Sequence, residues 1–219
     1  MATYPVSLVL EDRAVLVVGG GAVATRKVEG LLPTGAVITV VSPQLTDTLS
    51  ALVDDGRCAW RSKTYDAADL AGADLVFVAT DDETVNAQAY SDATRAHLLV
   101  NVADRPELCS FYLPSVLRRG KLSIAVSTEG SSPLSARRLR DECAALVPDK
   151  FEDYLELLGE WRPRVIAALP DERERYRFWE QATDGQVLAL VERGEIPAAD
   201  MLLEGILVEL RFCLDRPGA

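Results

Sequence analysis

The chain has 219 residues, and its 23 lysine and arginine residues against 34 aspartate and glutamate residues give a formal net charge of −11. With 48% hydrophobic and 26% charged residues, the composition is that of a globular protein with a sizeable core, which excludes a disordered chain and a collagen-like repeat. The net negative charge repels phosphate, so we expect no nucleic-acid partner. No apolar run approaches the roughly 20 residues of a membrane helix, and the N-terminal segment does not resemble a signal peptide. We therefore expect no membrane partner and a cytoplasmic location.

Side chains that commonly bind metals are sparse. His97 is the only histidine, which excludes a metal site built from several histidines. The cysteines at positions 58, 109, 143 and 213 form no CxxC pair, so we interpret them as reduced thiols and expect no resident metal.

The first half of the chain alternates short apolar runs with segments of helical spacing. Strands are predicted at 13–18, 36–41, 58–63, 74–79 and 98–101, and helices at 22–32, 45–54 and 82–95. Strands that alternate with helices indicate an α/β fold, with a Rossmann-like, doubly wound parallel sheet and right-handed crossovers.

The pattern changes after Asp104. Residues 111–117 and 122–127 flank Arg118-Arg119-Gly120-Lys121 and predict a β-hairpin. Ser132-Pro133 predicts the start of a helix, because serine is a good N-cap and proline fits the first helical turn. From residue 151 the chain is helical in pattern, with breaks near Pro170, Asp184-Gly185 and Pro197. We expect three parts, over residues 1–113, 114–150 and 151–219.

The segment 114–140 is basic in an otherwise acidic chain. It contains five arginines and one lysine, and its only acidic residue is Glu129. The basic residues are Arg118, Arg119, Lys121, Arg137, Arg138 and Arg140. Such an island can mark the site of an anionic ligand. The alternative is a hairpin and a helix face that are basic without a ligand, and charge alone does not separate the two.

A glycine-rich turn joins the first predicted strand to the first predicted helix. Gly19-Gly20-Gly21-Ala22-Val23-Ala24 matches G-x-G-x-x-A. In this motif Gly19 permits the tight turn, Gly21 lets a pyrophosphate approach the backbone, and Ala24 keeps the helix close to the sheet, while the helix N-terminus faces the anion. The motif predicts a dinucleotide site; the alternative is a purely structural turn.

The end of the second strand bears on the choice of dinucleotide. Val41-Ser42-Pro43-Gln44 contains neither the usual acid for a ribose 2′-hydroxyl nor an arginine for a 2′-phosphate. We favour NAD over NADP, with contacts from the backbone or side chains of this segment. The predicted cofactor-binding residues are Gly19, Gly21, Ala22, Val23, Ser42, Pro43, Gln44, Thr80, Asp81 and Asn101.

Seven motifs, in order along essentially the whole chain, carry a family resemblance. They are Pro5-Val-Ser-Leu8, the glycine turn extended to Thr25-Arg-Lys27, Ala79-Thr-Asp-Asp-Glu-Thr-Val-Asn86, Asn101-Val-Ala-Asp104, Ser110-Phe-Tyr-Leu-Pro-Ser115, Ala125-Val-Ser-Thr-Glu-Gly-Ser-Ser-Pro133 and Arg177-Phe-Trp-Glu180. The chain resembles the precorrin-2 dehydrogenase/sirohydrochlorin ferrochelatase family, whose module also forms the N-terminal part of multifunctional siroheme synthases.

The resemblance implies NAD-dependent oxidation of precorrin-2 to sirohydrochlorin, followed in many members by insertion of ferrous iron to give siroheme. It implies that residues 1–113 bind NAD and that residues 114–150 bind substrate and form a homodimer intertwined between subunits, with a helical C-terminal domain after them. The methyltransferase domain of the multifunctional members is expected to be absent. Position 128 is Thr where some relatives have Ser.

The family's catalytic aspartate maps onto Asp104, which is therefore expected to act as acid or base. From spacing alone, a turn or N-cap aspartate before Pro106 is the stronger interpretation. Because the tetrapyrrole carries several carboxylates, the expected substrate-binding residues are Thr128, Ser132, Arg118, Arg137 and Arg138. For Arg177, Phe178 and Trp179, packing is favoured over substrate binding.

Two other functions stay open. A non-catalytic NAD-sensing module would have no use for Asn101-Val-Ala-Asp104 beside a basic hairpin, and it usually carries a DNA-binding or membrane segment. A dehydrogenase of small hydroxy acids usually needs a histidine or lysine base near the nicotinamide, whereas His97 is expected at the amino-terminal end of the fifth strand.

Overall fold

The computed structural model describes the backbone of residues 3–214 and the side chains of residues 3–212, so the side chain of Cys213 lies outside the described residues. The chain divides into two compact units, Met1–Leu113 and Pro114–Ala219. The further division expected at residue 150 stays a prediction.

The first unit contains the predicted parallel sheet. Its strands are β1 (Ala14–Val18), β2 (Val37–Val41), β3 (Ala59–Arg61), β4 (Leu75–Val78) and β5 (Leu99–Val102). All neighbours pair in parallel, in the order β3-β2-β1-β4-β5, which confirms the Rossmann-like topology. β1 and β4 are buried on both faces, which explains why they are continuous apolar runs rather than alternating ones.

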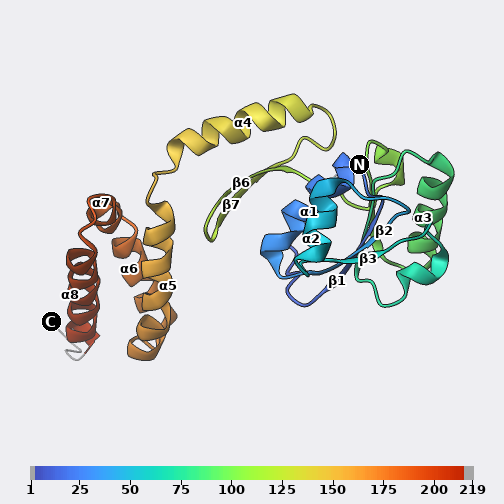
Figure 1. The fold of residues 1–219 in the computed structure, drawn as a ribbon. Helices are drawn as coiled ribbons and strands as arrows, with labels where there is room; N and C mark the ends of the chain where they lie inside the picture. The colour runs from blue at the N-terminus through green and yellow to red at the C-terminus, as the bar shows by residue number, and fades with distance from the viewer. Residues whose placement is uncertain (1–2, 215–219) are drawn as a thin grey trace. The chain divides into compact units, whose positions relative to one another are not determined.

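Helices cover both faces of this sheet. Helices α1 (Ala22–Leu31) and α2 (Asp47–Asp54) lie on one face and α3 (Glu83–Arg95) on the other (Figure 1). Short 3-10 turns are formed by Leu32–Thr34, Ala67–Leu70 and Pro106–Leu108. Alternate β1 residues enter the two core layers, Val15 and Val17 on one side and Leu16 and Val18 on the other.

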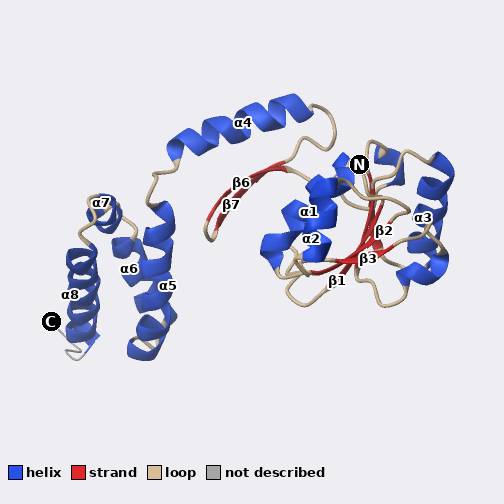
Figure 2. Cartoon of the chain, viewed as in Figure 1, coloured by secondary structure: helices blue, strands red, loops and turns tan. Residues whose placement is uncertain are grey.

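The second unit begins with a hairpin whose turn was predicted wrongly. β6 (Ser115–Arg119) and β7 (Leu122–Val126) form a hairpin (Figure 2). The two strands are antiparallel, and Arg119 pairs with Leu122. The turn is therefore Gly120-Lys121 alone, and Arg118 and Arg119 belong to β6. Gly120 has a φ of +53°, which suits a two-residue hairpin turn. β6 starts at Ser115 rather than at residue 111, directly after Pro114, which lacks an N–H for a sheet.

Helix α4 (Pro133–Leu146) follows the hairpin and packs against both of its strands. Its start confirms the prediction, because the Ser132 hydroxyl accepts a hydrogen bond from the Ser135 N–H at 3.2 Å.

Four helices complete the second unit: α5 (Phe151–Ala168), α6 (Glu172–Ala182), α7 (Gln186–Glu192) and α8 (Ile196–Leu214). The helix break predicted near Pro197 lies at Gly194, which has a φ of +78°. Pro197 itself is in the first turn of α8, where a residue needs no N–H for helical hydrogen bonding. No helix in the described part of the chain is long and apolar enough to cross a membrane.

Aromatic residues form the centre of this helical core. Trp161 and Phe178 stack with ring centroids 6.1 Å apart, and Trp179 meets Phe178 edge-on at 5.0 Å. Phe178 is fully buried, whereas Arg177 pairs with Glu174 at the surface. The expectation that Phe178 and Trp179 serve packing is confirmed.

Candidate functional site

The turn after β1 contains three glycines, and the surroundings of a Cβ atom would differ at each of them. Gly19 has a φ of +119°, and a Cβ there would lie 2.1 Å from the Ala79 carbonyl oxygen. A Cβ on Gly20 would lie 1.9 Å from the Gln44 carbonyl oxygen, whereas a Cβ on Gly21 would meet no atom within 4 Å. The first two glycines are therefore required by the fold, and the third leaves open space beside the backbone, as a pyrophosphate would need.

Helix α1 starts at this open space. Gly21 is its N-cap, and no side chain caps the first turn. The first N–H groups of a helix have no intrahelical partner, so those of Ala22 and Val23 are available to an anion. Ala24 is fully buried, which confirms the expected close packing of helix on sheet.

The loop after β2 is held against the glycine turn. The Thr46 N–H donates to the Gly20 carbonyl at 2.9 Å. The Ser42 hydroxyl donates to the Gln44 carbonyl at 2.7 Å, and the Trp60 indole N–H donates to the Ser42 carbonyl at 2.9 Å. The Ser42 side chain is thus used inside the loop, and its contact with a ribose stays a prediction.

A further polar residue, Asn86 in the first turn of α3, lies beside the loop that follows β4. Asn86 is only 6% exposed and donates from Nδ2 to the Thr80 carbonyl at 2.9 Å, while its Oδ1 accepts no hydrogen bond from the described residues. Asp82 caps α3, and the neighbouring Asp81 is exposed. Asn86 was not among the expected site residues, although it closes the Ala79–Asn86 motif.

Asn101, in β5, organises the segment that follows that strand. It is 7% exposed, and its Nδ2 donates to the Phe111 carbonyl at 3.0 Å and lies 3.5 Å from the Cys109 sulfur. The Cys109 thiol donates to the Val102 carbonyl at 3.2 Å, and burial raises the pKa of this thiol. The Asn101 amide thus holds the chain beyond Asp104 in place.

Asp104 is exposed just beyond β5 and makes no hydrogen bond or ion pair with the described residues. Its φ is +58°, a left-handed conformation that aspartate tolerates in turns. It does not cap the 3-10 turn Pro106–Leu108, whose N-cap is Arg105 without a side-chain hydrogen bond. The N-cap half of the alternative is therefore wrong, whereas Asp104 does lie in a turn. Its carboxylate accepts no hydrogen bond from the described residues and lies at the carboxyl-terminal edge of the sheet.

Lys27 is a second charged residue near Asp104, and the sequence interpretation gave it no role. It is half-buried in α1, with its Nζ 5.7 Å from the centroid of the Phe77 ring. Burial lowers the pKa of the Lys27 ammonium, and the neighbouring Cys109 and Asp104 act in the opposite direction. Its position in the extended glycine motif was the available signal.

The basic island of the second unit separates into structural and free residues. Arg119 donates to the carbonyls of Val147 and Pro148, the latter at 3.1 Å, and so caps the end of α4. Arg140 pairs with Asp141. The three arginines expected to bind substrate are exposed and form no ion pair within the described residues: Arg118, Arg137 and Arg138.

The two hydroxyl residues expected at the substrate site shape the loop before α4. The Thr128 Oγ1 accepts from the Ser132 N–H at 3.1 Å, and the Ser131 N–H donates to the Thr128 carbonyl at 2.8 Å. Ser132 in turn caps the helix. Among the residues with described positions, no group of three or more His, Cys, Asp and Glu side chains could hold a metal ion.

Comparison with known proteins agrees with this arrangement. A family model described as "Putative NAD(P)-binding" matches residues 6–115, just over half of the chain. The sirohaem biosynthesis protein central model matches residues 119–146, and the sirohaem synthase dimerisation region matches residues 154–207.

Curated relatives and a solved structure follow the same pattern. The siroheme synthase of Psychrobacter cryohalolentis is 40% identical over 194 residues, which cover 89% of this chain and 37% of that protein. The siroheme synthase of Photorhabdus laumondii is 39% identical over 93% of this chain and 43% of its own length. The chain thus spans about two fifths of the length of these relatives.

The structure of SirC, a precorrin-2 dehydrogenase, superposes with a TM-score of 0.77 at 29% identity, covering 93% of this chain and 100% of that one. Three family regions in the expected order, a parallel sheet with an open glycine turn, and this similarity over nearly the whole chain lead to one assignment. The chain belongs to the sirohaem synthase family, of which it carries the NAD(P)-binding, central and dimerisation regions.

Proposed function

We propose that this protein uses NAD to oxidise precorrin-2 to sirohydrochlorin. The observation that carries the proposal is that one edge of one sheet bears both an unobstructed glycine turn and the free carboxylate of Asp104. The first feature suits a dinucleotide and the second suits proton transfer, and a dehydrogenase needs both at one place. The structural neighbour SirC is named for the same reaction.

The residues present fit a nicotinamide dinucleotide. The space beside Gly21 would receive the pyrophosphate, the uncapped start of α1 would donate N–H groups to it, and the unsatisfied Oδ1 of Asn86 offers a buried acceptor beside Thr80. Bound NAD supplies the hydride acceptor. The residues that would hold the dinucleotide are Gly19, Gly21, Ala22, Val23, Ser42, Pro43, Gln44, Thr80, Asp81 and Asn101.

Asp104 is assigned the proton chemistry. Conversion of precorrin-2 to sirohydrochlorin removes a hydride and a proton, and the carboxylate accepts that proton. No donor among the described residues binds its oxygens, and the side chain is exposed, so a bulky substrate can reach it. Lys27 adds a positive charge near Asp104, where it can attract a carboxylate of the substrate.

For the second unit, we propose a surface of its own that binds substrate carboxylates. Arg118, Arg137 and Arg138 are exposed and unpaired within the described chain, and arginine binds carboxylates in a two-point geometry. Thr128 and Ser132 complete this proposed surface.

We propose a homodimer as the active form. The dimerisation-region match covers residues 154–207, and α4 exposes Leu139 (50%) and Leu146 (82%) on one face, since they lie seven residues apart. Light scattering should therefore give about twice the monomer mass of 23.8 kDa. A stable monomer contradicts this part of the proposal.

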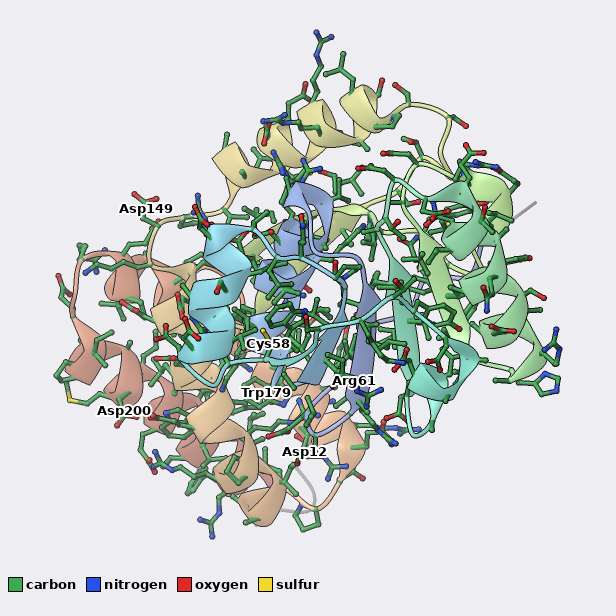
Figure 3. All side chains as sticks on the ribbon, turned by 45° about the vertical axis from the view of Figure 1, so that its right-hand side comes forward. Asp12, Cys58, Arg61, Asp149, Trp179 and Asp200 are labelled. Atoms are coloured by element: carbon green, nitrogen blue, oxygen red, sulfur yellow. The ribbon has the colours of Figure 1, made fainter. Side chains whose placement is uncertain are left out.

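The decisive experiment is an anaerobic assay of precorrin-2 and NAD followed by absorption. Asp104→Asn should slow oxidation by about 100- to 10,000-fold, the usual worth of a positioned acid or base, while NAD affinity is retained. The matched control is Asp12→Asn, because Asp12 is another exposed aspartate with a φ of +58° but precedes β1, at the opposite edge (Figure 3).

The assay also separates the competing functions. Oxidation by Asp104→Asn at the wild-type rate contradicts the role of the carboxylate. A wild-type protein that binds NAD but leaves precorrin-2 unchanged supports the non-catalytic sensor instead. Ferrous ion added after oxidation is complete tests iron insertion separately, through the absorption of siroheme.

A further inference from the structure

The usual device for choosing between NAD and NADP is missing from β2. In dinucleotide-binding sheets the adenosine ribose lies at the carboxyl end of this strand, where an acid binds the 2′-hydroxyl or an arginine accepts a 2′-phosphate. Here that position holds Ser42-Pro43-Gln44, whose side chains carry no charge. Any electrostatic selection must come from a neighbouring element.

The neighbouring strand end provides two cations. Arg61, labelled in Figure 3, is the last residue of β3 and lies beside Val41 in the sheet register. The Ser42 N–H donates to the Arg61 carbonyl at 3.3 Å, so the ends of β2 and β3 are in direct contact. Lys63 follows two residues later. In this position, two free cations would attract a 2′-phosphate.

Neither cation is free, because both bind Asp69. This aspartate lies in the 3-10 turn after β3, and its side chain is 3% exposed. Arg61 Nη1 lies 3.0 Å from its Oδ1, and Lys63 Nζ lies 2.9 Å from its Oδ2. The Asp66 N–H donates to Oδ2 at 3.0 Å, and the Asp66 carboxylate also pairs with Lys63. Two positive and two negative groups leave this cluster without net charge.

The Asp69 carboxylate stays ionised at neutral pH. Burial favours the protonated form, but hydrogen bonds from Lys63, from the Asp66 N–H and from Arg61 outweigh it, and the pKa of Asp69 is lowered. Removing a cation from a buried carboxylate leaves that charge uncompensated, which is costly. A dinucleotide phosphate therefore competes poorly with Asp69 for Arg61 and Lys63.

We propose that Asp69 makes the dinucleotide site selective for NAD over NADP by holding Arg61 and Lys63 in ion pairs. The inference rests on the proposed function, because it assumes that the first unit binds a nicotinamide dinucleotide. It assigns selectivity to a residue outside the segments expected to touch the cofactor.

Calorimetric titration with NAD and with NADP at one salt concentration tests the inference. The wild-type protein should bind NAD at least about tenfold more tightly than NADP. Asp69→Asn, which keeps the shape and removes the charge, should raise NADP affinity about tenfold and change NAD affinity less than about threefold. The double variant Asp69→Asn with Arg61→Gln should lose the gain.

Two further variants serve as a control and as an alternative to asparagine at position 69. Asp74→Asn removes the same charge from the amino-terminal edge, where the Asp74 carboxylate accepts from the Ala14 N–H, and it should change neither affinity. Asp69→Ser also removes the charge, with a smaller polar side chain, and should reproduce the effect of asparagine if that variant does not fold.

Equal wild-type affinity for the two dinucleotides overturns the inference. So does a folded Asp69 variant with normal NAD binding and unchanged NADP binding. A wild-type protein that binds neither dinucleotide contradicts the proposed function itself, and the inference falls with it. The same titrations therefore distinguish failure of the inference from failure of the proposed function.

Discussion

Gly20 and Gly21 are adjacent in the chain, yet a methyl group would meet opposite surroundings at the two positions. At Gly20 a Cβ would overlap the Gln44 carbonyl, 1.9 Å away, and at Gly21 it would enter open space. The φ of Gly21, −85°, is an ordinary value for any residue. The fold therefore requires glycine at position 20, whereas the proposed dinucleotide requires it at position 21.

Alanine substitutions should separate these constraints. Gly20→Ala should lower the free energy of unfolding by about 1–3 kcal/mol, because the loop after β2 must move. Gly21→Ala should change it by less than about 0.5 kcal/mol but weaken NAD binding at least about tenfold, because the methyl group occupies the space for the pyrophosphate. Denaturant melts and calorimetry measure the two effects; equal destabilisation by both variants would contradict this distinction.

Replacement of Lys27 should impair activity without lowering stability. Its ammonium is half-buried, and burial disfavours the charge, so Lys27→Met should leave the melting temperature unchanged or raised. The same variant removes the positive charge near Asp104, so the KM for precorrin-2 should rise about tenfold. Lys27→Arg, which keeps a charge, is the control. Unchanged kcat/KM in the methionine variant would show that this cation has no role.

At the scale of elements, the hairpin and α4 are joined through Arg119. Its guanidinium donates to the last carbonyls beyond α4, from Val147 and Pro148, while its neighbour Arg118 is exposed and forms no such bonds within the described residues. Consecutive residues of a strand point to opposite faces. Arg119 therefore stabilises the contact with α4, whereas Arg118 stays available to a ligand.

Methionine at each position tests this division. Arg119→Met should destabilise the second unit by about 1–3 kcal/mol, because the partly buried carbonyls of Val147 and Pro148 lose a charged donor. Arg118→Met should leave stability within about 0.5 kcal/mol and raise the KM for precorrin-2. Thermal melts and steady-state assays provide the readouts. A larger stability loss from Arg118→Met than from Arg119→Met would reverse the assignment.

Elements with local signals were predictable from the sequence. The buried strands are apolar runs bounded by turns, and all five lie within two residues of their predicted ends. The hairpin was misplaced because Arg118-Arg119-Gly120-Lys121 looks like a polar turn, and only the pairing of Arg119 with Leu122 shows that the arginines are in the strand. Two-residue turns leave little sequence signal beyond the glycine.

Parts of the site that depend on long-range packing were not predictable. The need for glycine at position 20 arises from the Gln44 carbonyl, and the approach of Lys27 to Asp104 arises from the packing of α1 on β4. Likewise, Asp69 reaches Arg61 and Lys63 only because the chain folds back after β3. A single sequence shows the residue types at these positions but not which of them meet.

At the scale of the whole molecule, the two units have separate cores and should respond differently to acid. The first unit contains Asp69, whose pKa is lowered by Lys63, the Asp66 N–H and Arg61 in excess of the opposing effect of burial. Such a carboxylate stabilises the folded state fully above its unfolded pKa of about 3.9, and this contribution is lost as the pH falls through the lower folded value. In the second unit, the described carboxylates with a resolved pKa shift are limited to Glu195, which is exposed and pairs with Arg193.

The first unit should therefore lose more stability than the second between pH 5 and about pH 2. Amide hydrogen exchange can follow each unit separately, with the amides of β1 and β2 reporting on the first and those of α5 on the second. Asp69→Asn should lower protection in β1 and β2 at pH 7, since Arg61 and Lys63 lose their partner. The difference from wild type should shrink as the pH falls, because protonation removes the same charge. A constant difference across this range would show that Asp69 contributes by shape rather than by charge.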